Sequence, residues 1–139
     1  MLCLTGWTEE QALVAKRKDG ALVVVTGCGH PIIETILEMA CRLDPAGVHT
    51  VVGGLHFPIT TSRISRFGIQ FQQIIGTGKG WWEEISDTDL TATIAALNEA
   101  GVRRLLLSAH DTCDHAVERF RREVRADVEV LRAGSSYTL

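Results

Sequence analysis

The sequence lacks the features that mark membrane, secreted and nucleic-acid-binding proteins. No apolar run approaches the roughly 20 residues of a membrane-spanning helix. The first seven residues have no basic region and too short an apolar run for a secretion signal, so we expect a cytoplasmic protein. Lys and Arg number 14 against 17 Asp and Glu, giving a net charge of −3, which argues against nonspecific binding to nucleic acid.

The cysteines are few and widely spaced. Cys3, Cys28, Cys41 and Cys113 form no CxxC pair, and without a secretion signal we expect reduced thiols. Internal repeats are also absent, and the 139 residues are typical of a single domain, 1–139, with a long loop or insertion at about 57–85. The mean hydropathy of +0.11 is high for so small a domain and predicts that a partner chain covers part of its apolar surface.

The spacing of apolar residues predicts an α/β fold. A hairpin is expected across 11–26, turning at Asp19-Gly20, and Ser86 and Gly101 are the expected start and end signals of a helix. The remaining pattern predicts strands at 48–52, 102–109, 128–131 and 137–139, and helices at 32–43, near 69–75 and across 116–124. We expect one sheet that is largely covered by helices.

Three of the predicted strands each end in a histidine. His30, His56 and His110 follow the strands, and each precedes a turn or a helix. Parallel strands would place all three imidazoles beyond the same edge of the sheet, where α/β proteins bind ligands. Neutral imidazoles suit Zn²⁺ or another borderline divalent metal. One such histidine alone is more often a residue that caps a turn, but three at equivalent positions favour a metal site.

Two neighbouring residues extend this candidate site. Asp111 follows His110, where a carboxylate can bind the metal, hold a ligand in place or act as a catalytic acid or base. As an aspartate before a predicted helix, Asp111 can equally serve as the helix N-cap. Cys28 lies two residues before His30, where it is either a thiolate ligand or a small buried residue of a tight turn.

Lys79 and its neighbours form a candidate substrate-binding segment. The run GTGKG at 76–80 resembles a phosphate-binding loop, but no Ser or Thr follows Lys79 and no predicted strand leads into it. Together with Arg63 and Trp81, Lys79 would present a cationic and aromatic surface to an anionic small-molecule substrate. The alternative is an ordinary surface loop.

Three segments, in this order, carry a family resemblance: LVVVTGCGHPII at 22–33, VVGGLHFP at 51–58 and LSAHDTC at 107–113. They resemble the C-terminal half of the metallo-β-lactamase-fold, metal-dependent hydrolases, and most of all the branch related to dihydropterin-type phosphate synthases. The segment EEQALV at 9–14 also resembles the strand before the Gly-Cys-x-His turn of that branch. The resemblance implies half of an αββα sandwich, with one mixed sheet and helices on one face.

The resemblance also implies a chemistry. Hydrolases of this family use a mono- or dinuclear zinc site to activate water. The matching positions imply that His30, His110 and Cys28 are metal ligands and that His56 is a ligand or a polar group beside the substrate.

The family's His-x-His-x-Asp-His motif, which supplies most of its metal ligands, is missing, because no histidine precedes His30. We therefore expect a truncated hydrolase-like protein with weak or partner-dependent activity, in which a homodimer buries the exposed sheet face. The alternative is a non-catalytic oligomeric binding module that retains the half-fold.

Overall fold

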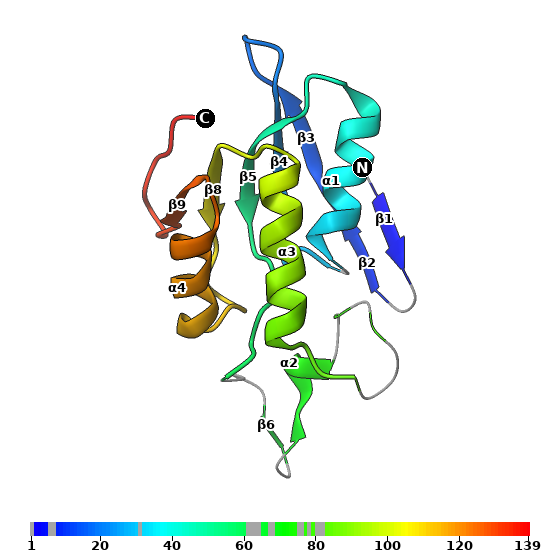
Figure 1. Cartoon of the computed structure of the whole chain (residues 1–139), viewed down its shortest axis with the longest axis vertical. Helices are drawn as coiled ribbons and strands as arrows, with labels where there is room; N and C mark the ends of the chain where they lie inside the picture. Colours follow the sequence, from blue (N-terminus) through cyan, green and yellow to red (C-terminus); the bar gives the residue numbers. More distant parts are fainter. Residues whose placement is uncertain are drawn as a thin grey trace.

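The computed structural model describes residues 2–5, 8–30, 32–60, 65–66, 69–74, 77, 79 and 83–139. A mixed five-stranded sheet forms its centre, in the order β3-β4-β5-β8-β9 (Figure 1). Strand β3 runs antiparallel to β4, and all the other neighbours run parallel. The bounds are Leu13–Lys16 for β3, Leu22–Val25 for β4, Val48–Gly53 for β5, Arg104–Leu107 for β8 and Asp127–Val130 for β9. The expected α/β class, hairpin and parallel strands are confirmed.

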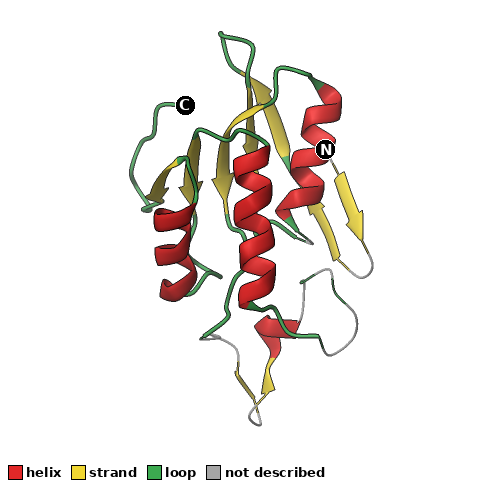
Figure 2. Ribbon diagram, in the orientation of Figure 1, coloured by secondary structure: helices red, strands yellow, loops and turns green. Residues whose placement is uncertain are grey.

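Three helices cover one face of the sheet: α1 (Ile33–Leu43), α3 (Asp87–Glu99) and α4 (Asp114–Glu123), as Figures 1 and 2 show. The core lies between these helices and the sheet, and alternate strand residues point into it. Val24, Val51 and Leu105, which pair across three neighbouring strands, are all fully buried there. None of the helices in the described part of the chain combines the length and apolar composition needed to cross a membrane.

Helix α3 begins and ends where the sequence predicts. Ser86 and Asp89 form a reciprocal capping box at its start. Gly101 follows its C-terminus with a φ of 71°, a left-handed conformation that glycine adopts without steric penalty. These local signals place the end of α3 just before β8, and therefore help to set where β8 begins.

The opposite face of the sheet carries a second apolar row. Side chains alternate along a strand, so the residues next to the core positions point away from the helices. Four of them pair across the sheet in one row: Leu13, Val25, Val52 and Leu106. Leu13, at the edge of the row, is 65% exposed. The C-terminal segment reaches this face, because Arg104, on the same side of β8 as Leu106, donates a hydrogen bond of 2.5 Å to the Thr138 carbonyl.

The N-terminal residues form a hairpin that the apolar pattern of the sequence does not predict. Strand β1 (Leu2–Thr5) pairs antiparallel with β2 (Thr8–Gln11), and β2 leads directly into β3. Within the 57–85 segment, the described residues form two short strands and one short helix, which are β6 (Ser65–Arg66), β7 (Ile69–Gln70) and α2 (Phe71–Ile74). Helix α2 lies inside the range 69–75 in which a short helix is expected.

The strand expected at 137–139 is wrong. These residues form no strand, although the preceding β9 does pair with β8 as expected. Side-chain contacts hold the C-terminal segment instead, since the Arg132 N–H donates to the Tyr137 hydroxyl over 2.9 Å. Thr138 and Leu139 are exposed, so they bury too little apolar area to fix another strand at the sheet edge.

Candidate metal centre

The three histidine-bearing loops meet beyond the carboxyl ends of β4, β5 and β8. Backbone hydrogen bonds join each loop to the next. The Gly54 N–H donates to the Gly27 carbonyl over 2.8 Å, and the Ser108 N–H donates to the Gly53 carbonyl over 2.8 Å. The parallel sheet therefore brings the loops to one edge, as the sequence predicts.

Two glycines permit this close approach. Gly53 has a φ of 134°, and a Cβ atom there would lie 2.1 Å from the Thr26 carbonyl oxygen. A Cβ atom on Gly54 would lie 2.8 Å from Cε1 of His110 and 2.9 Å from the Gly27 carbonyl oxygen. Real Cβ atoms do not approach other atoms so closely, so any side chain at either position would push the loops apart.

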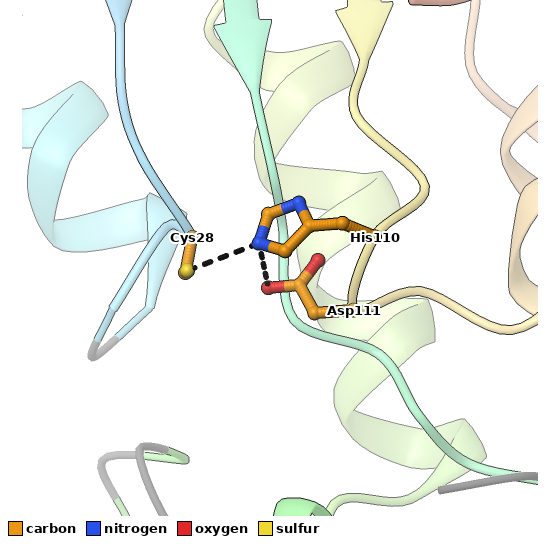
Figure 3. Close-up of side chains that lie close together, drawn as sticks. All are labelled: Cys28, His110 and Asp111. Atoms are coloured by element: carbon orange, nitrogen blue, oxygen red, sulfur yellow. Dashed lines mark hydrogen bonds and ion pairs between the residues drawn. The ribbon is translucent and has the colours of Figure 1, made fainter. Parts of the chain in front are cut away.

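Five potential metal donors lie together at this edge. They form two groups that share one carboxylate: Cys28, His110 and Asp111 in the first, and His30, His56 and Asp111 in the second, with the donor atoms of each group all within 4.8 Å of one another. Figure 3 shows the first group, in which Cys28 Sγ lies 3.2 Å from His110 Nε2. In the second group, the rings of His30 and His56 lie 4.3 Å apart between centroids.

Asp111 lies between the two groups. Its Oδ2 atom is 3.5 Å from His110 Nε2 and 3.5 Å from His56 Nδ1. The N-cap of α4 is Cys113, so the alternative that Asp111 caps this helix is wrong. Asp111 is only 6% exposed, and its Oδ2 accepts no hydrogen bond from the described residues. A buried carboxylate oxygen without a hydrogen bond is destabilising unless a cation balances it, so this position fits a metal ion.

His56 has a strained backbone. Its φ is 55°, and among the described residues no other non-glycine residue has a positive φ. This left-handed conformation costs about 1–3 kcal/mol in a residue other than glycine, and such strain is concentrated at functional sites. The left-handed turn carries the buried His56 side chain to its contact with Asp111.

Ser108 orients the His110 ring. Its hydroxyl lies 2.9 Å from His110 Nδ1. If Nε2 held a metal, Nδ1 would carry the ring hydrogen and donate it to this hydroxyl, which is the usual way in which a protein fixes a histidine ligand. His110 is also the most open of the group, with 46% of its side chain exposed.

The Cys28 thiol is protonated at neutral pH in the metal-free protein. Burial raises its pKa to about 11, and the negative charges of Asp111 and Glu10 and a hydrogen bond with Asp111 act in the same direction. A metal ion that binds the sulfur must therefore displace a proton.

Glu10 contacts the loop that carries Cys28 and His30, although it is not among the site residues predicted from the sequence. Its Oε1 atom accepts hydrogen bonds from the Thr26 hydroxyl and from the Gly27 and Gly29 N–H groups, and its Oε2 atom accepts one from the His30 N–H. Burial raises the pKa of Glu10, but these four hydrogen bonds outweigh it and hold the pKa below its ordinary value. No local signal marks Glu10, because its partners lie 16 to 20 positions away along the chain.

Of the candidate substrate-binding residues, Lys79 is the one that the structure describes. Lys79 donates to the carboxylate of Asp89 over 2.9 Å and to the Glu84 carbonyl over 3.2 Å, near the start of α3. Arg63 and Trp81 lie outside the described residues. A surface pocket of about 820 Å³ lies between α4, β9 and the C-terminal segment, and none of the five donors lines it.

One solved structure has a similar fold over nearly the whole chain. It is the crystal structure of a metal-dependent hydrolase of the beta-lactamase superfamily, with a TM-score of 0.69 and 27% sequence identity. The match covers 94% of this chain but only 41% of the other. The chain therefore spans less than half the length of this relative, and its fold is that of part of a beta-lactamase-superfamily hydrolase. No protein-family model and no curated protein matches the sequence.

Proposed function

We propose that this chain carries the zinc-binding part of a metal-dependent hydrolase, of the branch related to dihydropterin-type phosphate synthases. The observation that carries the proposal is the pair of donor groups that share the buried Asp111. Three imidazoles, a thiol and a carboxylate form a donor set that Zn²⁺ prefers. The likeness to a metal-dependent hydrolase supports the same chemistry.

Each donor has a separate role in this proposal. Cys28, His110 and Asp111 would hold a metal ion, and His30 and His56 would provide a second position with the same aspartate. Ser108 keeps the His110 ring in the orientation in which Nε2 faces Cys28. When bound, zinc would supply Lewis-acid activation of water and stabilise the negative charge of a hydrolytic transition state.

The exposed side of His110 gives a small-molecule substrate access to the site. The second donor group is more enclosed, since His56 is 8% exposed and Asp111 6% exposed. We infer that substrate approaches from the His110 side, while the buried carboxylate keeps its charge away from water. We further propose that the activity is weak or depends on a partner that completes the site.

Metal analysis of the purified chain tests the proposal. We expect zinc at a stoichiometry near one or two per chain after reconstitution, and its loss in the double variant His30→Ala, His110→Ala. The matched control is His49→Ala, His115→Ala, which removes two histidines that contact Thr50 and Asp87, respectively, and belong to neither donor group. The control should keep the zinc.

Thermal unfolding provides a second readout. Zinc at 100 times its dissociation constant should stabilise the native state by about 2.7 kcal/mol, so a chelator should lower the melting temperature of the wild type and of the control. If the reconstituted wild type holds no zinc, the proposal is wrong and the non-catalytic binding module is favoured.

A further inference from the structure

We propose that Glu10 is a positioning residue for the metal centre: its carboxylate fixes the loop Thr26–His30 so that Cys28 and His30 point to their partner donors. The inference rests on the proposed function, because it concerns the same site. Glu10 belongs to β2, which lies outside the five-stranded sheet, so the inference gives this strand a role in positioning the site.

The Glu10 carboxylate accepts hydrogen bonds from every residue of the loop except Cys28. Besides the Thr26 hydroxyl, Oε1 accepts from the Gly27 N–H at 2.8 Å and from the Gly29 N–H at 3.0 Å. The other oxygen, Oε2, accepts from the His30 N–H at 2.5 Å. Hydrogen bonds to an ionised acceptor are stronger than those between neutral groups, so this one side chain restrains the whole loop.

The loop needs such a restraint because its own sequence is permissive. Glycines at 27 and 29 flank Cys28, and Gly29 has a φ of 78°. Glycine loses more conformational freedom on folding than any other residue, so this loop has many backbone alternatives. The bond to the Gly29 N–H fixes the peptide plane that follows Cys28, and the bond to the His30 N–H fixes the plane that precedes His30. The bond to the Gly27 N–H fixes the plane between Thr26 and Gly27, one residue before Cys28.

The restraint matters for the donors because their contacts reach across the fold. Cys28 meets His110, which lies 82 positions away along the chain, and His30 meets His56 in the loop after β5. Both contacts depend on the direction in which the β4 loop leaves the sheet. Glu10 sets that direction from outside the loop, without touching a metal position itself.

The variant Glu10→Gln tests the inference. Glutamine keeps the length of the side chain but loses its charge, and its amide nitrogen faces backbone donors. We expect the Gly29 and His30 amides to exchange with solvent about tenfold faster or more, measured by NMR in the metal-free protein. We also expect Co²⁺ to bind about 10–100-fold more weakly and the sulfur-to-cobalt charge-transfer band, which reports Cys28 coordination, to weaken. Glu38→Gln is the matched control, because Glu38 is an exposed residue of α1 that pairs with Arg42.

Each outcome decides a separate point. If the amide hydrogens of Glu10→Gln exchange faster but the variant keeps the wild-type affinity and spectrum with Co²⁺, Glu10 is merely structural and the inference is wrong.

If the wild type binds no Co²⁺, the proposed function fails, and the inference is judged by the nuclear Overhauser contact between the His30 and His56 rings. Its retention in Glu10→Gln would overturn the positioning role. Should Glu10→Gln not fold, Thr26→Val removes one of the four hydrogen bonds and should produce smaller effects in the same direction.

Discussion

Replacing Gly54 by alanine tests whether the site depends on the close approach of its loops. The added Cβ atom would lie 2.8 Å from His110 Cε1, 2.9 Å from the Gly27 carbonyl oxygen and 3.0 Å from Asp111 Oδ1. The Gly27 carbonyl oxygen belongs to the backbone and cannot rotate away, so the new Cβ atom cannot shift toward it. The His110 imidazole must therefore move by about 0.6 Å to reach an ordinary van der Waals distance from the Cβ atom. Zinc–ligand distances vary by only about 0.2 Å, so we expect zinc affinity to fall at least about tenfold.

Gly101→Ala is the matched control for this prediction. A Cβ atom there would meet nothing within 4 Å, but the residue has a φ of 71°. The left-handed conformation costs alanine about 1–2 kcal/mol, while overpacking at Gly54 costs about 1–3 kcal/mol. Urea unfolding with a chelator present should therefore show similar losses of stability in the two variants. Only Gly54→Ala should lose zinc affinity, measured in competition with a chromogenic zinc chelator, and wild-type affinity in that variant would show that the site does not depend on the close approach of its loops.

Three further predictions concern the rest of the molecule. Ser86→Ala should lower the free energy of unfolding by about 1 kcal/mol, because it removes the acceptor of the Asp89 N–H at the start of α3; an unchanged urea midpoint would contradict this. Hydrogen bonds from Arg119 hold the pKa of Glu123 at about 2, below its ordinary 4.5, so their stabilisation is present above pH 4.5 and is lost as the pH falls toward 2. Glu123→Gln should accordingly destabilise the protein more at pH 7 than at pH 3. Urea unfolding that shows the same loss of unfolding free energy at both pH values would count against this prediction. The homodimer stays a prediction: sedimentation equilibrium should find a dimer that Leu13→Glu dissociates, and a wild-type monomer at micromolar concentration would exclude it.

Much of the fold could be predicted because its signals are local. Apolar periodicity marks β4, β5 and β8, and each is followed by a loop that carries a histidine. Parallel strands place their carboxyl ends at one edge, so the meeting of His30, His56 and His110 follows from strand order alone. The capping box at Ser86 and the glycine at 101 likewise depend on residues close together in the chain.

The role of Asp111 could not be predicted from local sequence signals. An aspartate before a helix has the same sequence signature whether it caps the helix or binds a metal. The choice depends on where α4 begins, and the structure places the N-cap at Cys113 instead. Asp111 is then free to enter the buried space between His56 and His110.

Local patterns in the sequence are enough to predict an α/β core with histidines at one edge of parallel strands, because periodicity and strand ends are properties of short segments. Three features depend on the folded chain: which donors share a group, the need for a residue without a side chain at Gly54, and the hold of Glu10 on the loop of Cys28. These are contacts between residues 16 to 82 positions apart, and they exist only when separate strands have packed in register. Long-range packing, which no local pattern encodes, therefore brings the three histidines and Cys28 together as two donor groups that share one buried carboxylate.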